Sequence, residues 1–296
     1  RSVGCSVGGA RAVGWVVRSG CGAVKGRRLE QGFELETTTG EVVRADRLLL
    51  ATGGNQNGNG RSLAEQLGHG VAPPCPSLFT FECGDGRISD LAGISVGDAV
   101  VSVEGTKLMQ RGPLLITHWG WSGPAILKLS AWGARILHEM DYRFGLRVQW
   151  VPGCRLEEMA ERLRGVKGEH GGKLVVSWNP FGLPGRLWQS LCLGVPGVTR
   201  EVAWAGVTKG GLLGLAEMLT GSRFEVTGKS LYKDEFVTCG GVVLKEIDFR
   251  TMGSRVCPGL YVAGELLDID GVTGGFNFQS AWTTGWIAGK SMGQDV

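Results

Sequence analysis

The sequence predicts an α/β protein, and three observations point to that class. Hydrophobic residues make up 43% of the 296 residues and charged residues 20%, a balance that is typical of a globular chain. The run Leu48–Ala51 is continuously apolar, which indicates a strand buried on both faces and covered by layers above and below. Glycine occurs 51 times without a fixed period, and dispersed glycine suits a fold with many tight turns.

The elements can be predicted in chain order from their hydrophobic spacing. Alternating residues over 33–37 and again from residue 41, joined by a turn at Thr39–Gly40, predict a β-hairpin. A short helix is expected over 61–67, after the buried strand. The remaining elements are expected as strands at 99–103, 113–117 and 224–227, and as helices at 124–140, 156–164 and 211–219.

The proline-rich segment VAPPCPS, residues 71–77, indicates a domain boundary because proline interrupts both helices and sheets. From residue 236 the pattern of the first region returns, with VTCGGVVL, then GLYVAGE, then a terminal helix. We therefore expect one α/β domain in two pieces, residues 1–74 and 236–296. An inserted domain of mixed strands and helices is expected over residues 75–235.

Composition limits the classes of partner. The net charge is only +3 and no basic stripe interleaves with aromatic residues, so we expect no nucleic acid partner. No apolar run approaches the ~20 residues that span a membrane, so no membrane partner is expected either. The eight cysteines are scattered without a C-x-x-C pair, which favours a reduced, intracellular location such as the cytoplasm. The chain starts without Met, so organelle targeting stays open, as does the oligomeric state.

Several motifs with well-defined chemistry can be set aside. A strict G-x-G-x-x-G is absent, and neither Gly-Lys-Ser tripeptide has the preceding glycine of a phosphate-binding loop. G-x-S-x-G occurs around Ser6 and Ser95, but without the strand and helix that a nucleophile elbow needs. Asp268 and Asp270 are too few ligands for a calcium loop, so no metal site is expected.

One histidine has a context that suits an active site. His118 lies in LLITHWGWSGPAIL, where a strand would deliver it with Trp119 and Trp121 to the start of a helix. A histidine beside tryptophans is more often a packed structural residue, so both interpretations stay open. His118 is the one catalytic candidate, and one of the two tryptophans is expected to line a pocket with it.

Two strand ends form the strongest local signal. LLLATGG places Thr52–Gly54 where a buried strand meets a loop, and LYVAGE does the same with Gly264–Glu265. Ligands of open α/β sheets collect at the carboxyl ends of strands. The helix after Gly274–Gly275 would point its free N–H groups toward that edge, and such groups favour negative or electron-rich ligands. The glycines could also be ordinary turn residues, but two matched strand ends favour a ligand.

Four segments occur in the following order along the chain: ADRLLLATGGN, GPLLITHWGWSGPAILKLSA, VTCGGVVLKEIDFRTMGS and GLYVAGELLDIDGVTGGFNFQSAWTTGWIAG. In these segments the sequence resembles the BaiN-like, aminoacetone-oxidase-like flavoproteins, which are FAD-dependent oxidoreductases of the glutathione-reductase structural type. The resemblance covers most of residues 41–289. It implies an FAD-binding three-layer sandwich in two pieces, with an inserted β-rich and helical domain that would cover the flavin and shape the substrate pocket.

The resemblance also implies a set of cofactor-binding residues. They are Ala51, Thr52, Gly53, Gly54, Gly264, Glu265, Asp270, Gly274, Gly275, Phe276 and Asn277. The turn after the first strand would pass close to the dinucleotide, and the second strand end would hydrogen-bond the ribityl chain or a phosphate, with Asp270 near the same chain. The loop before the last helix would present N–H groups to the flavin N1/O2 edge, where a helix N-terminus stabilises negative charge.

The chain departs from the family at its start. Members of the family begin with a βαβ unit whose glycine-rich loop holds the FAD pyrophosphate, and residues 1–30 match that unit poorly. We therefore expect an N-terminally truncated chain, lacking the first βαβ unit, that binds FAD weakly by itself. The expected activity is hydride transfer between a small organic substrate and flavin N5, with NAD(P)H or oxygen as the candidate electron partner. The alternatives are an RNA-modifying flavoprotein of the same fold and a non-catalytic scaffold that has lost FAD.

Overall fold

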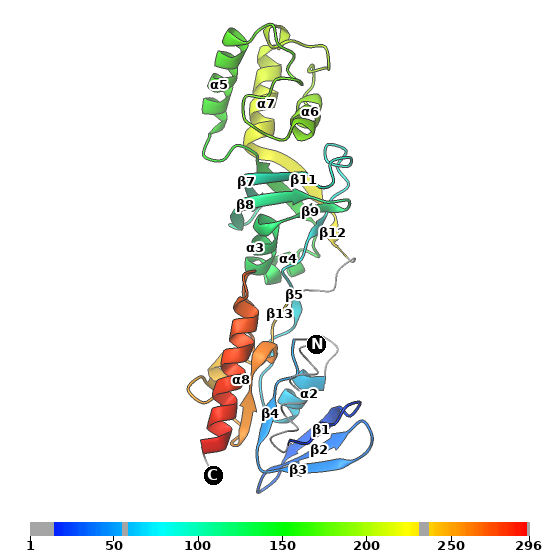
Figure 1. The fold of residues 1–296 in the computed structure, drawn as a ribbon, viewed down its shortest axis with the longest axis vertical. Helices are drawn as coiled ribbons and strands as arrows, with labels where there is room; N and C mark the ends of the chain where they lie inside the picture. The colour runs from blue at the N-terminus through cyan, green and yellow to red at the C-terminus, as the bar shows by residue number, and fades with distance from the viewer. Residues whose placement is uncertain (1–14, 55–58, 231–236, 295–296) are drawn as a thin grey trace. The chain divides into compact units, whose positions relative to one another are not determined.

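The structure, a computed structural model, describes residues 15–54, 59–230 and 237–294. The chain divides into two compact units, whose helices and strands are labelled in Figure 1. The first unit runs to Pro73 and resumes over Gly240–Ile269 and from Phe278 onward, and the second comprises Pro74–Cys239 and Asp270–Asn277. The sequence placed its boundaries after residues 74 and 235, whereas this division falls after residues 73 and 239 and groups residues 270–277 with the second unit.

An antiparallel three-stranded sheet opens the first unit. Strands β1 (Ala23–Arg28), β2 (Phe33–Thr37) and β3 (Val42–Ala45) pair in that order, which confirms the predicted hairpin and adds β1. Helix α2 (Asn59–Gln66) packs on this sheet beside Gly26. A Cβ at Gly26 would lie only 3.3 Å from a methyl group of Leu63, so the glycine allows the helix to approach closely.

The second sheet of this unit carries the predicted strand ends. Its strands are β14 (Ile247–Asp248), β15 (Gly253–Ser254), β16 (Leu260–Val262) and β4 (Leu48–Leu50), in that order. Only β16 and β4 run parallel, and their three residue pairs are in register. Leu50 is buried, but Leu48 and Leu49 are half-buried, so the prediction of a strand covered on both faces is wrong for two of its residues. The reason is that β4 is the edge strand of this sheet among the described residues.

Helix α8 (Phe276–Gln294) follows the short 3₁₀ turn η3 (Gly264–Leu266) in the chain. The small residues Ala281, Gly285 and Gly289 recur every four positions along it, a pattern that predicts a flat packing face, and that prediction is wrong for the two glycines. A Cβ at Gly285 or Gly289 would meet nothing within 4 Å, whereas Thr284 and Ala288 are buried. The helix therefore packs through Thr284 and Ala288, one turn apart, and the glycines lie to the side of that contact.

The second unit is built on a seven-stranded antiparallel sheet in the order β11-β10-β7-β8-β9-β6-β12. Its strands are β6 (Phe81–Glu82), β7 (Ser95–Val103), β8 (Met109–Ile116), β9 (Gly120–Ser122), β10 (Phe144–Gln149), β11 (Ser222–Val226) and β12 (Gly228–Lys229). A separate two-stranded ladder joins β5 (Cys75–Ser77) to β13 (Val237–Cys239). The predicted strands at 99–103, 113–117 and 224–227 are confirmed as β7, β8 and β11, and β6, β9, β10 and β12 are additions to this sheet.

Five helices accompany this sheet among the described residues. They are α3 (Pro124–Trp132), α4 (Ala134–Glu139), α5 (Leu156–Glu169), α6 (Gly185–Leu193) and α7 (Lys209–Gly221). The single helix predicted over 124–140 is interrupted at Gly133. A Cβ there would lie 2.6 Å from a methyl group of Leu108, so the chain approaches too closely for any other residue without a shift.

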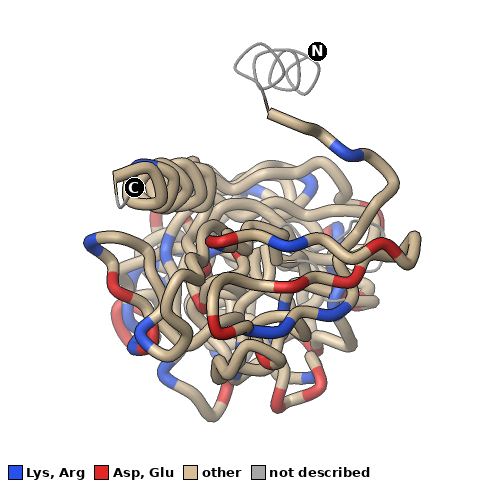
Figure 2. Tube along the Cα trace, turned by 90° about the horizontal axis from the view of Figure 1, so that it is seen from below, with Lys and Arg blue, Asp and Glu red and all other residues tan. Residues whose placement is uncertain are grey.

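Charged residues of both signs alternate along the trace. Lys and Arg are interspersed with Asp and Glu in Figure 2, and ion pairs such as Arg147–Glu104 and Arg111–Asp98 join neighbouring strands. This distribution agrees with the small net charge of +3.

Candidate functional site

The two predicted strand ends of the first unit lie side by side. Because β4 and β16 are parallel and in register, the chain leaves both strands at the same edge of the sheet, and the Ala263 N–H donates to the Leu50 carbonyl at 3.0 Å. Gly53 and Gly264 have φ angles of 77° and 72°, which L side chains rarely adopt. A Cβ at Gly53 would meet nothing within 4 Å, so its backbone borders open space. The structure thus brings together the two strand ends that the sequence singled out.

Thr284 holds one of these strand ends in place. The Gly264 N–H donates to Thr284 Oγ1 at 3.0 Å, and that hydroxyl donates to the Ser280 carbonyl at 2.7 Å. The amide of Gly264 is therefore engaged within the protein, and the side chain of the half-buried Glu265 is the polar group of this pair that can face a ligand. Sequence reasoning missed Thr284, because its neighbour Ala281 and the glycines of α8 carried the more regular pattern.

The remaining predicted residues lie in the second unit, in the segment from Asp270 to the start of α8. The Ser77 hydroxyl donates to Asp270 Oδ2 at 2.9 Å from a fully buried position on β5. Asn277 Oδ1 accepts from the Gly271 N–H at 2.7 Å, and Asn277 Nδ2 donates to the Gly271 carbonyl at 3.0 Å. Both polar ends of the Asn277 amide therefore close the loop that precedes α8.

That loop ends in two glycines with positive φ, 124° at Gly274 and 85° at Gly275. Both are exposed, and a Cβ at Gly275 would meet nothing within 4 Å. No acidic residue stands in the first turn of α8, so the partial positive charge of the helix N-terminus is not neutralised by its own side chains.

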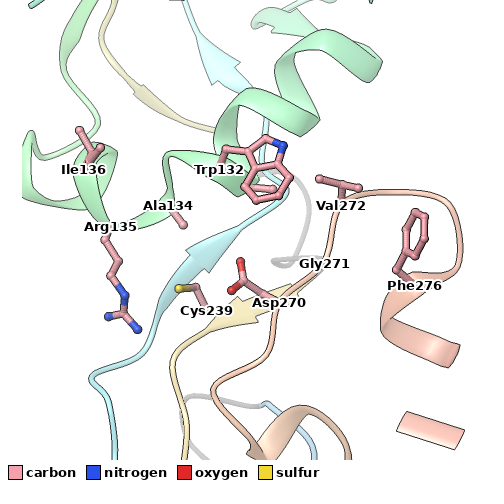
Figure 3. A pocket seen from close by; sticks show the side chains of 10 residues that line it. Trp132, Ala134, Arg135, Ile136, Cys239, Asp270, Gly271, Val272 and Phe276 are labelled. Atoms are coloured by element: carbon pink, nitrogen blue, oxygen red, sulfur yellow. The ribbon is translucent and has the colours of Figure 1, made fainter. Parts of the chain in front are cut away.

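A cavity of about 600 Å³ opens in the second unit beside this loop (Figure 3). Its lining residues are Ala131, Trp132, Ala134, Arg135, Ile136, Cys239, Asp270, Gly271, Val272 and Phe276. The walls are mainly apolar, with large exposed faces from Trp132 and Phe276. One carboxylate, one guanidinium and one thiol supply the polar groups, so the cavity suits a flat, largely apolar ligand with a few polar substituents.

The thiol of Cys239 is held in its neutral form. Burial, and after it the negative charge of Asp270 and the neighbouring Cys75, raise the pKa of Cys239 to about 12, and Arg135 opposes them. Figure 3 shows the Cys239 sulfur beside the Asp270 carboxylate. At neutral pH the cavity therefore contains a protonated thiol next to its single carboxylate.

Trp132, Arg135 and Cys239 were missed as site residues. Trp132 and Arg135 lie inside the long helix predicted over 124–140. The helical spacing of its apolar residues predicted a core position for Trp132. The interruption at Gly133 ends α3 at Trp132, and that side chain is exposed. Cys239 carried no signal beyond its membership of the VTCGGVVL segment.

His118 lies apart from this cavity's lining. It is exposed in the turn between β8 and β9 and is not among the residues that line the cavity. Trp119 donates its Nε1–H to Thr80 Oγ1 at 3.2 Å, and Trp121 is fully buried against Trp150 and Phe224. An active-site role for His118 stays a prediction.

Within residues 15–54, 59–230 and 237–294, no group of three or more His, Cys, Asp or Glu side chains is placed to hold a metal ion. Over the same ranges, no helix combines the length and the apolar character needed to cross a membrane.

Most of the sequence matches a known protein family. The family described as HI0933-like protein Rossmann domain matches residues 14–291. The chain belongs to this family. The HI0933-like family is of the FAD-binding Rossmann type, so the expected mixed α/β fold with a Rossmann-type domain and the expected membership of a flavoprotein family are confirmed.

Three curated proteins with named functions are similar to this HI0933-like chain. It is 31% identical over 272 residues to the ribosomal RNA dihydrouridine synthase of Escherichia coli, covering 89% of this chain and 64% of the relative. It is 31% identical over 255 residues to the protein of that name in Haemophilus influenzae, covering 83% and 60%. It is 27% identical over 275 residues to the 3-dehydro-bile acid delta(4,6)-reductase of Clostridium scindens, covering 89% and 66%. The chain thus spans less than two thirds of the length of these relatives.

The chemistry of the residues present fits a flavin dinucleotide. In the first unit, the glycine backbone after β4 borders open space at the carboxyl edge of a parallel strand pair, where a side chain would obstruct a dinucleotide. In the second unit, the two positive-φ glycines leave the N-terminus of α8 open and unneutralised. Each feature by itself suits a part of such a cofactor: open glycine backbone suits a phosphate chain, and a free helix N-terminus suits an electron-rich ring edge.

Proposed function

We propose that this protein is an FAD-dependent oxidoreductase that reduces a carbon–carbon double bond activated by a neighbouring carbonyl group. The observation that carries the proposal is the parallel β4–β16 pair, which places the open backbone of Gly53 and the strand end at Gly264–Glu265 at one edge of the sheet. When bound, FAD would supply the hydride chemistry at its N5 atom. The BaiN-like subgroup of flavoproteins is the relationship that we favour within the family.

The proposed reaction class rests on what the named activities of two relatives have in common. A dihydrouridine synthase forms a product in which the ring double bond of uridine is saturated, and a delta(4,6)-reductase saturates double bonds of a 3-oxo compound. In both, the double bond is conjugated with a carbonyl. An apolar cavity with a few polar groups suits such a flat, conjugated substrate or the flavin ring itself.

The residues of the second unit would position and polarise the bound molecules. Ser77 fixes one oxygen of Asp270, so the carboxylate can accept a hydroxyl hydrogen bond in a set direction. The Asn277 amide holds the loop that presents Gly275 and the first N–H groups of α8. Those N–H groups would stabilise the negative charge that gathers at the N1/O2 edge of a reduced flavin ring. Considered by itself, the first unit offers Ala51–Gly54 and Glu265 as contacts for a dinucleotide.

Flavin content is the first test. The protein is expressed from its whole reading frame, purified, and its absorbance recorded in the visible flavin bands. We expect a yellow protein whose released cofactor is FAD. A correctly folded but colourless protein would contradict the proposal and favour the non-catalytic scaffold.

A charge-matched pair of variants tests the placement of α8. Gly275→Asp and Gly275→Asn introduce side chains of the same size, and both residues tolerate positive φ better than most. We expect Gly275→Asp to weaken binding of dithionite-reduced flavin about tenfold more than Gly275→Asn, because a carboxylate beside N1/O2 repels the negatively charged reduced ring by roughly 1.4 kcal/mol or more. Equal affinity of the two variants for reduced flavin would argue against flavin at this helix.

Neither the family description nor the relatives' names point to a nicotinamide as electron donor. The reaction is therefore tested with a chemical reductant in place of the natural donor. The flavin is reduced chemically with dithionite in the absence of oxygen and mixed with a conjugated enone. We expect the flavin bands to return as the enone is consumed. Simple ketones without the double bond serve as the control and should leave the flavin reduced.

A second candidate function is reduction of uridine in ribosomal RNA. Two relatives at 31% identity carry that function in their names, although the small net charge of +3 had argued against an RNA partner. The same reduced protein is mixed with ribosomal RNA, and dihydrouridine is measured by mass spectrometry of the nucleosides. Formation of dihydrouridine, with no reaction of small enones, would assign the RNA function instead.

A further inference from the structure

A pair of cysteines stands directly opposite each other in the second unit. Cys75 on β5 and Cys239 on β13 are register partners in the antiparallel ladder of these two strands. Partners in such a ladder have Cα atoms about 4.5 or 5.5 Å apart, according to whether the pair is hydrogen-bonded. A disulfide requires Cα atoms about 4.4–6.8 Å apart, so either geometry allows the bond without backbone movement.

The two side chains point to the same side of the ladder. Cys75, Cys239 and Ala134 form a small buried cluster, and the Cys75 side chain hydrogen-bonds with that of Cys239. Both cysteines are reduced, as are the other five cysteines that the structure describes. None of those five has another cysteine as its strand partner within the described ladders.

One of the two thiols is open to a reagent. Cys239 lines the cavity of about 600 Å³, whereas Cys75 lies behind it on β5. A small disulfide molecule can therefore reach Cys239 first, and Cys75 is placed to complete the exchange.

We propose that Cys75 and Cys239 form a dithiol site that low-molecular-weight disulfides oxidise to a cross-strand disulfide. Cys239 attacks one sulfur of the reagent disulfide, which breaks the reagent's S–S bond and releases one thiol. Cys75 then attacks the Cys239 sulfur of the mixed disulfide and releases the second thiol. Two protein S–H bonds are exchanged for one protein S–S bond, and the reagent disulfide is reduced to two thiols, so atoms and electrons balance.

The surroundings make this exchange slow at neutral pH. Burial, the Asp270 carboxylate and Cys75 raise the pKa of Cys239, against the opposing charge of Arg135. Only the thiolate attacks, so the site would respond to sustained oxidising conditions and not to brief exposure. Disulfides in reducing compartments are usually transient and redox-sensing, which agrees with a pair that is reduced at rest.

Oxidation would alter two properties of the second unit. It removes the Cys239 S–H group from the cavity wall, and it ties together the strands at either end of the segment from Cys75 to Cys239. Closing so long a segment restricts the unfolded chain, which raises the melting temperature. This proposal does not depend on the proposed flavin chemistry.

The test treats the folded protein with mixtures of reduced and oxidised glutathione. The protein is then unfolded in acid, its remaining thiols are alkylated, and peptides are mapped by mass spectrometry. We expect loss of two alkylatable thiols, a Cys75–Cys239 cross-linked peptide lighter by two hydrogens, and a higher melting temperature that dithiothreitol reverses. The initial rate should rise about tenfold per pH unit between pH ~7 and ~10, whereas an ordinary thiol levels off above ~8.5.

Three variants sharpen the result. Cys75→Ala and Cys239→Ala should each abolish the cross-link, and Cys21→Ala, which removes a more exposed thiol, should leave it unchanged. Asp270→Asn should accelerate the exchange, because one cause of the raised thiol pKa is removed. A cross-link between other cysteines, a stable glutathione adduct on Cys239 alone, or no loss of thiols at any glutathione ratio would overturn the proposal. The wild-type peptide map decides the matter even if a variant fails to fold.

Discussion

Four tryptophans of the second unit and the aromatic residues of α8 in the first have opposite surroundings. In the second unit, Trp121, Trp150, Trp188 and Trp204 are at most 2% exposed, and Trp121 packs edge-on against the ring of Phe224 with centroids 4.9 Å apart. In the first unit, α8 carries Phe278, Trp282 and Trp286 with 67–72% of each side chain exposed. These three residues repeat every four positions and so share one face of the helix, away from the buried Thr284 and Ala288.

The contrast shows that the hydrophobic content of a segment does not decide what it contributes to stability. Full burial of a large side chain is worth about 1.5–3 kcal/mol, and an exposed one contributes little. The second unit thus has a continuous core, whereas the aromatic face of α8 leaves much of its apolar area in contact with water. Contiguous exposed apolar faces are unusual on soluble proteins and often mark contact with another surface.

The largest test of this contrast compares two tryptophans. Trp121→Ala should lower the free energy of unfolding by about 3–5 kcal/mol, because it opens a cavity among Trp150 and Phe224. Trp282→Ala should change it by ~0.5 kcal/mol or less, since its ring is exposed. Urea denaturation of both variants gives the two values. A loss of several kcal/mol from Trp282→Ala would show that the face of α8 is covered in solution and would break the contrast.

Two glycines offer a test of intermediate size. Gly133→Ala in the second unit places a methyl group 2.6 Å from Leu108 Cδ1 and 3.0 Å from the Leu129 carbonyl, and should cost about 1–3 kcal/mol. Gly289→Ala on α8 meets nothing within 4 Å and should stabilise by about 0.5–1 kcal/mol through helix propensity. Thermal unfolding followed by circular dichroism measures both shifts. Opposite signs are expected, and a stabilising Gly133→Ala would mean that the close approach at Leu108 is absent.

The smallest expected effect concerns acid stability. Arg87 donates two hydrogen bonds to Asp85, at 2.9 and 2.7 Å, and these bonds lower the pKa of that carboxyl. An acid whose pKa is lower in the folded state stabilises above its unfolded pKa near 4, and this stability is lost as the pH falls through the folded value. Asp85→Asn should therefore flatten the loss of stability below pH ~4, by roughly 1 kcal/mol or less.

The first unit provides the counterpart. Arg27 and Arg44 lower the pKa of Glu34 through hydrogen bonds, so the direction is the same. These two arginines are 69% and 74% exposed, against 23% for Arg87, so solvent screens them more strongly. Glu34→Gln should therefore reduce the loss of stability in acid by less than Asp85→Asn does. Urea midpoints measured from pH 7 to pH 2 compare the two, and a larger effect of Glu34→Gln would reverse the ranking of the units.

Local patterns predicted the elements well, and long-range contacts explain what they missed. The hairpin at 33–45 and the start of α3 at Pro124 follow from alternation and from proline at a first helical turn, both of which are local. The break at Gly133 depends on Leu108, which lies 25 positions earlier, so helical spacing alone could not reveal it.

The same distinction applies to the candidate site. The two glycine-rich strand ends were predictable because each follows an apolar run, and parallel strands place such ends at one edge. The Ser77–Asp270 hydrogen bond joins residues 193 positions apart, and Thr284 reaches Gly264 from the following helix. Such pairings are products of the tertiary fold, and no spacing in the sequence encodes them.

The amide of Asn277 has a further consequence for recognition. Because it both donates to and accepts from the backbone of Gly271, residues 271–277 form a closed ring before any ligand arrives. The conformational entropy of this segment is lost once, during folding, so ordering it does not weaken each binding event. An aspartate at this position would keep the acceptor and lose the donor, leaving the ring open on one side. The segment would then have to be ordered again by every molecule that binds there.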